Sequence, residues 1–404
     1  MAATTEARVD VNFADPAVNH DIHAHYRRVR EAGPVVFNGL MQKHLVAGYA
    51  ELRKMLVSEA FFETDKEFFD NLFNGRAFQA DDNPRHNETR SSWDPHLRRN
   101  AVLARHELMQ EIATEAIDGL AGRLRAGERV ELVHAVALDI PTRLITRLLG
   151  IPQDELAVWQ GWADDISELS NELTGPRAAV LELQDVAGFQ AIRAMCEAGG
   201  EQLARRRAMG DTSDLIGLLA HSPVVETLAE DEQRAQIASV FMAGHETTAK
   251  FLTNAMNVLA RHPEQLEALV ADRALIPQAI EELLRYSGVV GPVMRVASED
   301  TELGGVPVAA GSQMVGLPSA ANRDPSRWER PDVFDVFRAS LPNIAFGFGT
   351  HVCIGQHLAR ANAEIILNRI FDQIPGYRVI ETEDELDYGT NWLIRAPVRL
   401  HLEL

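Results

Sequence analysis

The sequence predicts a mainly α-helical fold with small β-sheets, and three observations lead to this class. Long stretches carry apolar residues three and four positions apart, which is the period of an amphipathic helix. Strand-like runs are short, and no repeat or linker rich in Ser, Gly and Pro divides the chain. We therefore expect one domain over residues 1–404 and allow for a flexible tail over residues 1–14. The predicted helices cover residues 98–124, 135–149, 186–208, 229–261, 275–286 and 355–372.

The predicted strands lie near both ends of the chain and in one central segment. "GPVVF" and "HLVAGY" come early, a segment beginning at Met294 follows the fifth helix, and "RAPVRLHLEL" ends the chain. In the central segment Gly304 and Gly305 separate two alternating runs. A glycine pair in that position predicts a β-hairpin.

Composition and charge limit the classes of partner. Hydrophobic residues make up 46% and charged residues 24% of the 404 positions, as in soluble globular proteins. The formal net charge of −20 argues against nucleic acid and anionic membrane as partners, because both would repel the protein. The first residues lack the pattern of a signal peptide, and no run of apolar residues is long enough to span a membrane. We expect a cytoplasmic protein.

The chain has two cysteines, and they have different surroundings. Cys196 lies in the helical stretch "AIRAMCEAGG" and is interpreted as a packing residue. Cys353 lies in "FGFGTHVCIG", just before the last predicted helix. The amide groups and dipole of a helix N-terminus favour a thiolate there, and glycines 347, 349 and 355 let a flat ligand approach the backbone.

A structural cysteine in a glycine-rich turn is the alternative interpretation of Cys353. The joint pattern of Phe, Gly, His and Cys arises by chance on the order of 10⁻⁹ times per starting position, which counts against this alternative. A zinc site would need further cysteines or histidines at ligand spacing, and none accompany Cys353. One thiolate beside space for one flat ligand indicates haem.

The loop resembles the haem-binding loop of the cytochrome P-450 family. The resemblance implies haem b (iron protoporphyrin IX) with Cys353 as the axial ligand of the iron. It also implies a fold in which haem lies between a long distal helix and the helix that follows the cysteine loop. The matching residues are Phe346, Gly347, Gly349, His351, Cys353 and Gly355.

A second motif, "MAGHETTAK", interrupts the apolar pattern of the helix predicted over 229–261. A glycine inside a helix costs about 1 kcal/mol, so something must compensate for it. The segment is similar to the A-G-x-[D/E]-T motif that crosses the distal haem face in this family. The resemblance implies that Ala243 and Gly244 make room for O2, that Thr247 hydrogen-bonds the bound O2, and that Glu246 relays protons.

Two further sets of residues resemble family patterns. Glu282 and Arg285 match the E-x-x-R motif, and with Arg338 they are expected to form a buried ionic network that supports the cysteine loop. The stretch "DDNPRHNETR" resembles a segment whose His and Arg bind haem propionates. The implied propionate partners are His86, Arg90, Arg295 and His351.

The resemblance implies a haem-thiolate monooxygenase that hydroxylates, or oxidatively demethylates, a substrate with O2 and two external electrons. By family position the pocket is expected within residues 61–79 and 165–190 and around 239–242, 290–294 and 392–394. Aromatic and aliphatic groups dominate there, which favours a compact apolar substrate such as a terpenoid or a substituted aromatic compound. The predicted lining residues are Phe78, Ser239, Met242, Val290, Val293 and Leu393.

The sequence contains no dinucleotide-binding fingerprint and no cysteine cluster, so we expect separate electron donors, a ferredoxin or flavodoxin with an NAD(P)H reductase. Arg98, Arg99 and Arg105 are candidates for the surface that binds the donor. Two alternatives stay open. A peroxygenase would use peroxide directly, and a haem sensor would have no turnover. The pair Glu246 and Thr247 counts against both.

Overall fold

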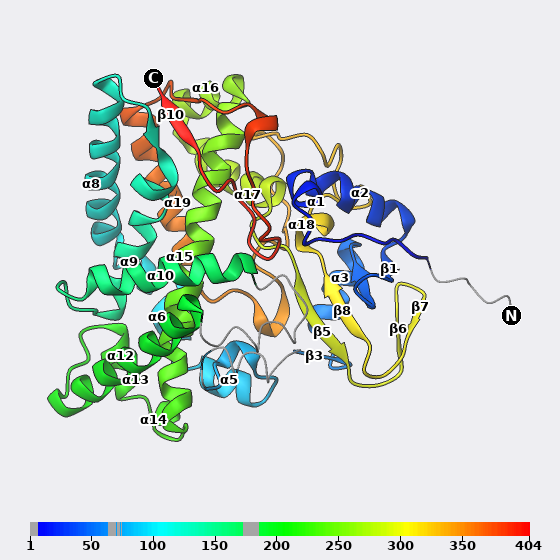
Figure 1. Cartoon of the computed structure of the whole chain (residues 1–404), viewed down its shortest axis with the longest axis horizontal. Coiled ribbons are helices and arrows are strands. Elements are labelled where there is room, and N and C mark those ends of the chain that lie inside the picture. The colour runs from blue at the N-terminus through cyan, green and yellow to red at the C-terminus, as the bar shows by residue number, and fades with distance from the viewer. Residues whose placement is uncertain (1–6, 64–69, 71–72, 74, 173–185) are drawn as a thin grey trace, which may run out of the picture.

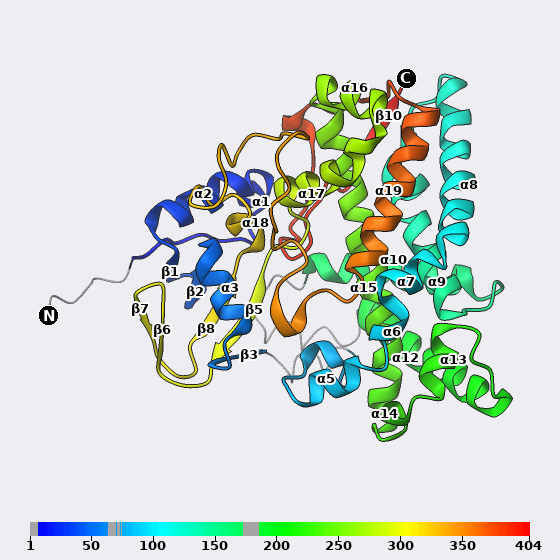
Figure 2. The same cartoon turned by 180° about the vertical axis from the view of Figure 1, so that it is seen from behind.

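The computed structural model describes residues 7–63, 70, 73, 75–172 and 186–404. Most long helices lie on one side of the molecule and the main sheet lies on the other (Figure 1). The reverse view shows α19 beside α8 on the helical side (Figure 2). This arrangement confirms the predicted mainly helical class with small sheets.

The helices differ widely in length. The long ones are α8 (His106–Arg125), α9 (Asp139–Leu149), α10 (Leu156–Glu172), α12 (Ala187–Met209), α15 (Glu230–Ala260), α17 (Ile276–Ser287) and α19 (Gln356–Gln373). The shorter ones are α1 (Pro16–His20), α2 (Ile22–Ala32), α3 (Tyr49–Val57), α5 (Arg85–Arg90), α6 (Asp94–Leu97), α7 (Arg99–Leu103), α13 (Leu215–Ala220), α14 (Pro223–Glu226), α16 (Pro263–Ala271) and α18 (Pro318–Ala321).

The predicted helix boundaries agree closely with the structure. Four helices, α12, α15, α17 and α19, begin and end within one residue of the predicted limits. The stretch 98–124 is instead divided, because α7 ends at Leu103 and α8 begins at His106. The stretch 135–149 opens as a π-helical turn over Val133–Ala137 before α9 begins.

Helix α15 runs through the centre of the helical side. It packs against α12, α9 and α17, so it is buried on several faces rather than on one stripe. Close approach of α12 depends on small residues, since a Cβ at Gly199 would lie 3.0 Å from Ile237 Cγ2. The long central helix therefore has a fixed position relative to its neighbours.

The described residues form three small sheets. The main sheet has the order β1-β2-β8-β5-β3, in which only the β2–β8 pair is parallel. The hairpin predicted at Gly304 and Gly305 is confirmed, and both glycines have positive φ angles of 61° and 80°. The strands are β1 (Val35–Asn38), β2 (Lys43–Val46), β3 (Phe61–Glu63), β4 (Val130–Glu131), β5 (Val293–Ala297), β6 (Thr301–Leu303), β7 (Val306–Val308), β8 (Gln313–Gly316), β9 (Arg378–Val379) and β10 (His401–Glu403).

Residues 7–14, which the sequence suggested as part of a flexible tail, pack against the rest of the chain. The amide of Val9 donates to the Phe37 carbonyl at 3.0 Å. Val11 and Phe13 are buried, and the Phe13 ring stacks on Trp392 with 4.8 Å between centroids. The apolar contacts of Phe13 thus join the start of the chain to a turn near its end.

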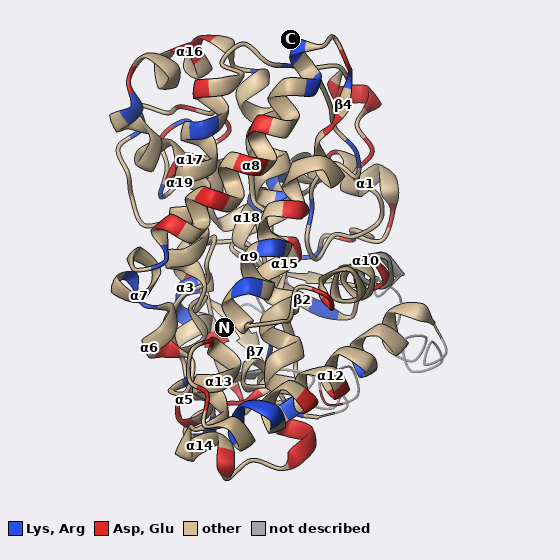
Figure 3. Cartoon of the chain, turned by 90° about the vertical axis from the view of Figure 1, so that its left-hand side faces the viewer, with Lys and Arg blue, Asp and Glu red and all other residues tan. Residues whose placement is uncertain are grey.

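The acidic character of the chain is visible on its surface. Exposed carboxylates recur along α8, and Figure 3 shows these acidic positions facing the viewer on that helix. Among the described residues, no helix combines the length and the apolar character needed to cross a lipid bilayer.

Candidate functional site

The cysteine loop is shaped by its main chain. Gly347 and Gly349 have φ angles of 72° and 76°, a region that residues with a Cβ rarely adopt. The amide of Cys353 donates to the Phe346 carbonyl at 2.8 Å, which closes the loop just before α19 begins. A Cβ on Gly349 would lie 2.8 Å from the Leu56 carbonyl oxygen. The loop therefore requires glycine at position 349 for two separate reasons.

The Cys353 sulfur experiences opposing electrostatic effects. Burial raises the pKa of its thiol above the ordinary value, and this effect is the largest. Hydrogen bonds from the amides of Gly355 and Gln356, and the charges of Arg90 and Arg360, act in the other direction. The helix N-terminus favours the thiolate, as predicted from the sequence, but burial outweighs this effect. A bound metal ion would supply the positive charge that deprotonates such a thiol.

A cavity that is partly open to solvent lies between the cysteine loop and the middle of α15, and the empty space there, open solvent included, is about 470 Å³. Cys353 and Ala243 are both exposed although they lie in the interior of the fold, because both face this cavity. Its lining residues are Pro141, Leu144, Ile145, Ala243, Gly244, Thr247, Thr248, Phe346, Cys353, Gly355, Leu358, Ala359 and Asn362. Most of these are apolar, which suits a large organic ligand.

The segment of α15 beside the cavity remains helical. The Thr247 hydroxyl donates to the Ala243 carbonyl one turn earlier at 2.8 Å. Such a bond diverts a backbone carbonyl from the regular helical pattern and can bend a helix. Gly244 lets α9 approach, since a Cβ there would lie 3.1 Å from Ile145 Cδ1. Glu246 is buried, pairs with Lys250 at 2.9 Å and is not among the residues that line the cavity.

A cluster of basic side chains lies beside the cysteine loop. The rings of His86 and His351 are 4.0 Å apart between centroids. Burial, the largest effect, and the nearby His86, Arg295 and Arg90 together lower the pKa of His351 to about 3. The titratable neighbours that lower the pKa of His351 are thus all basic. Among the described residues, the buried Nε2 atom of His86 has no hydrogen-bond partner.

Arg90 connects this cluster to the cysteine loop. Its guanidinium donates to the carbonyl oxygens of Thr350 at 3.2 Å and Val352 at 2.8 Å, and it pairs with Asp94 at 3.1 Å. The loop is also held from the other side. Arg360 pairs with Glu281 of α17 at 2.5 Å and lies over the Phe346 ring.

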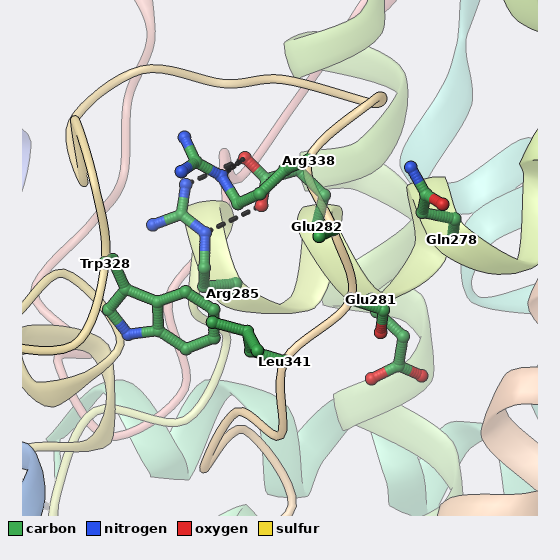
Figure 4. A pocket seen from close by; sticks show the side chains of 9 residues that line it. Gln278, Glu281, Glu282, Arg285, Trp328, Arg338 and Leu341 are labelled. Carbon is green, nitrogen blue, oxygen red and sulfur yellow. Dashed lines mark hydrogen bonds and ion pairs between the residues drawn. The ribbon is translucent and has the colours of Figure 1, made fainter.

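Glu282, Arg285 and Arg338 meet in the interior, where Figure 4 shows the two guanidinium groups converging on one carboxylate. Arg285 contacts both carboxylate oxygens, at 2.7 and 2.8 Å, and Arg338 contacts one at 3.1 Å. Arg285 also donates to the carbonyls of Asn322, Pro331 and Val333. The buried charges are therefore paired and hydrogen-bonded, the condition under which such groups are tolerated.

The residues predicted to line the substrate pocket do not gather at this cavity. Phe78 and Ser239 are buried, and the Ser239 hydroxyl donates to the Gln236 carbonyl at 3.0 Å. Within the described part of the chain, none of Phe78, Ser239, Met242, Val290, Val293 and Leu393 is among the lining residues. Residues 64–69, 71–72, 74 and 173–185, which belong to the predicted pocket segments, lie outside the described residues.

The three arginines proposed for donor binding differ in exposure. Arg98 and Arg99 are exposed, although Arg98 contacts Asp94 at 3.4 Å. Arg105 is half-buried and donates to the His96 carbonyl, so it presents less charge to a partner. Cys196 is buried, and its thiol donates to the Phe73 carbonyl at 3.1 Å, in keeping with a packing role.

The residues present fit a haem. A sulfur faces an apolar cavity, and basic groups lie where an anionic ligand could pair with them. Prediction from the sequence missed Leu144 and Ile145 of α9 and Asn362 of α19, which line the cavity, and Lys250, which pairs with Glu246 away from it. In the sequence, Leu144 and Ile145 look like any other apolar core residues. A lysine within a helix segment that is otherwise predicted to be buried, such as Lys250, can be noticed from the sequence.

Comparisons with known proteins agree with this geometry. Residues 188–374 match the family model described as Cytochrome P450. The chain is 31% identical to pentalenic acid synthase of Streptomyces avermitilis over 88% of this chain and 87% of that protein. It is 32% identical to vitamin D3 dihydroxylase of Streptomyces griseolus, covering 77% of this chain and 73% of that protein.

A solved structure has the same fold. The crystal structure of CalO2 superposes with a TM-score of 0.87 at 26% identity and covers 98% of both chains. The identity and coverage of the relatives, together with the likeness of fold, establish the class of the protein. The chain belongs to the cytochrome P450 family, and it is a monooxygenase-class oxidoreductase that uses haem b.

Proposed function

We propose that this protein hydroxylates, or oxidatively demethylates, a small apolar substrate with O2 and two electrons from separate redox proteins. One observation carries the proposal: Cys353 and the α15 residues Ala243, Gly244 and Thr247 line the same largely apolar cavity. Haem bound there would supply the activation of O2, since a thiolate ligand favours cleavage of the O–O bond. The protein's own residues hold the cofactor, orient the substrate and deliver protons.

In this proposal Cys353 binds the haem iron and the basic cluster binds the propionates. Anionic groups beside His351 and His86 would offset the charges that now lower the pKa of these rings, from Arg90 at both and from Arg295 at His351. Arg90 would have two roles, since it would bind a propionate and already donates hydrogen bonds to the carbonyls of Thr350 and Val352. The glycines of the loop and the aromatic ring of Phe346 would complete the proximal wall.

Thr247 and Glu246 are proposed to handle protons on the α15 side. The Thr247 hydroxyl is at the cavity and its hydrogen is directed to the Ala243 carbonyl, so its oxygen can accept a hydrogen bond from a water. Glu246 would bring protons to this hydroxyl from the protein side. A peroxygenase or a sensor needs no such pair, which favours the monooxygenase.

The proposed substrate is a compact apolar molecule such as a terpenoid or a substituted aromatic compound. The apolar lining by Leu144, Ile145 and Leu358 supports this choice. So does the likeness to a vitamin D3 dihydroxylase, whose name specifies an apolar substrate. Camphor, β-ionone and 7-methoxycoumarin make a suitable first panel, read by the shift of the haem absorption band.

The decisive experiment measures NADH consumption and product by the holoenzyme with a surrogate ferredoxin and reductase. We expect NADH consumption to increase when a panel compound binds, with an oxygenated product. A sensor would consume no NADH, and a peroxygenase would give product with peroxide alone. A reduced protein that fails to give the red-shifted Soret band of thiolate coordination with carbon monoxide would exclude haem-thiolate chemistry altogether.

Electron donors are proposed to bind near Arg98 and Arg99, which follow the propionate-binding segment. Reversing both charges (R98E with R99E) should slow electron delivery severalfold and weaken its dependence on salt. R123E is the matched control, because Arg123 is exposed near the far end of α8, where Arg125 contacts Gln373 at the C-terminal end of α19. Equal rates for the two variants would contradict this docking surface.

A further inference from the structure

Lys250 forms an unusual interior ion pair on α15. Its ammonium lies 2.9 Å from Oε1 of Glu246, one helical turn earlier. The side chains of Lys250 and Glu246 are only 21% and 10% exposed, so both charges lie largely out of water. Lysine is a residue that proteins rarely bury unless it is paired. This ion pair is therefore expected to contribute more than a surface ion pair, which is worth little.

The ammonium is also fixed to a distant turn. Lys250 Nζ donates to the carbonyl of Ile394 at 2.9 Å. One turn further along α15, Asn254 donates to the carbonyl of Arg395 at 2.9 Å. The turn itself is held in place, because the amide of Gly291 donates to the Leu393 carbonyl at 2.9 Å. Lys250 thus joins the Glu246 carboxylate to a backbone of defined position.

Glu246 and Lys250 lie on a face of α15 other than the one that borders the cavity. Neighbouring helical residues differ by about 100° around the axis. Thr247 and Thr248 line the cavity, whereas Glu246 and Lys250 are not among its lining residues. A proton carried by Glu246 would therefore have to reach Thr247 from a carboxylate that is ion-paired with Lys250.

We propose that Lys250 is a positioning residue for proton delivery. It holds the Glu246 carboxylate in one orientation relative to Thr247 and connects that orientation to the turn at Ile394. Lys250 itself transfers no proton and touches neither cofactor nor substrate. The inference deepens the proposed function and depends on it, since it assigns a partner to the proposed proton relay.

The test compares holoenzyme variants with whichever of camphor, β-ionone and 7-methoxycoumarin shifts the haem band most. K250M keeps the length of the stem and removes the charge. We expect product formed per NADH to fall about tenfold, with more peroxide released. The solvent deuterium isotope effect on NADH consumption should change as well. Binding of the probe and the thiolate signature should stay as in the wild type, and K250R should restore most of the coupling.

Two controls separate positioning from general damage. K54M removes a lysine that likewise donates to a backbone carbonyl, that of Glu302 at 3.3 Å, but from an exposed position of α3. It should behave as the wild type. The double variant K250M with E246Q should be no worse than E246Q alone, because both changes act through one carboxylate.

A crystal structure of the K250M holoenzyme provides a measurement without turnover. In that structure the Glu246 carboxylate should no longer lie on the side of α15 that faces Ile394. K250Q, which retains a donor for that carbonyl, replaces K250M in every comparison if the latter does not fold. The role of Lys250 would be overturned if K250M left the product formed per NADH and the isotope effect unchanged. It would also be overturned if the loss in the double variant equalled the sum of the losses in K250M and E246Q. A missing thiolate signature in the wild type would instead overturn the proposed function itself.

Discussion

The cysteine loop and the middle of α15 face the same cavity, yet they are held in place by different means. In the loop, positive φ angles at Gly347 and Gly349 and main-chain hydrogen bonds set the path of the chain. In α15 the main chain stays helical, and side chains such as Thr247 and Glu246 provide the special features. A side chain can change its rotamer while the main chain stays in place, whereas the path of the loop is fixed by its backbone angles. The difference suits a fixed ligand on one side and moving protons on the other.

The largest effect on this comparison between the loop and α15 is expected from removing the Cys353 sulfur. C353A should abolish the thiolate signature of the reduced carbon monoxide complex, because no other sulfur lies among the residues that line the cavity. The helical content measured by circular dichroism should remain, since the loop is shaped by glycines and backbone bonds. A variant that loses both properties would show that the sulfur, and not the main chain, organises the loop.

The second largest effect is expected from the ionic network behind the loop. E282A leaves Arg285, which is 1% exposed, without its carboxylate partner. Removing one partner of a buried pair costs about 3–5 kcal/mol of stability, which denaturant unfolding would measure. E230A is the control, since Glu230 is 80% exposed in its pair with Arg234 and should contribute less than about 1 kcal/mol. Similar losses for the two variants would refute a special role for the network.

On the α15 side, T247A should change the chemistry and leave the cofactor in place. We expect product formation to fall by about 100-fold, the lower range for loss of a positioned proton donor or acceptor. The Soret band of the carbon monoxide complex should not move. T253A is the matched control, because Thr253 makes the same bond to the carbonyl one turn earlier, at 3.0 Å, but is buried away from the cavity. Equal activity of T247A and T253A would refute the role of Thr247.

Two glycine substitutions separate the effect of backbone strain in the cysteine loop from the effect of steric crowding. G347A adds a Cβ with nothing closer than 3.7 Å, so only the positive φ angle opposes it, at about 1 kcal/mol. G349A meets the same strain and also places its Cβ 2.8 Å from the Leu56 carbonyl oxygen, and should therefore cost more. Thermal unfolding of the two holoenzymes measures the difference. Equal melting temperatures would mean that the loop shifts readily.

The parts predicted well from the sequence are those whose signal is local. Long amphipathic runs gave α12, α15, α17 and α19 nearly to the residue. The loop motif lies within ten consecutive positions, so its glycines, histidine and cysteine could be interpreted together. The division between α7 and α8 was missed, because apolar spacing continues through it.

Other parts depend on contacts between distant segments, which a pattern along the chain does not encode. Arg90 meets the carbonyls of Thr350 and Val352, 260 and 262 positions away, and Lys250 meets Ile394, 144 positions away. The cavity wall formed by Leu144 and Ile145 has the composition of an ordinary helix face. Apolar residues give the same signal whether they fill a core or border a cavity.

The stacking of Phe13 on Trp392 has a practical consequence for handling the protein. Trp392 stands two positions before Ile394, whose carbonyl receives the Lys250 ammonium. Trimming the chain beyond Val11, or fusing a purification tag close to Phe13, would disturb a contact only a few residues from the proposed proton relay. Expression vectors for this enzyme are better designed with the tag at the other terminus, or with a long spacer before residue 7.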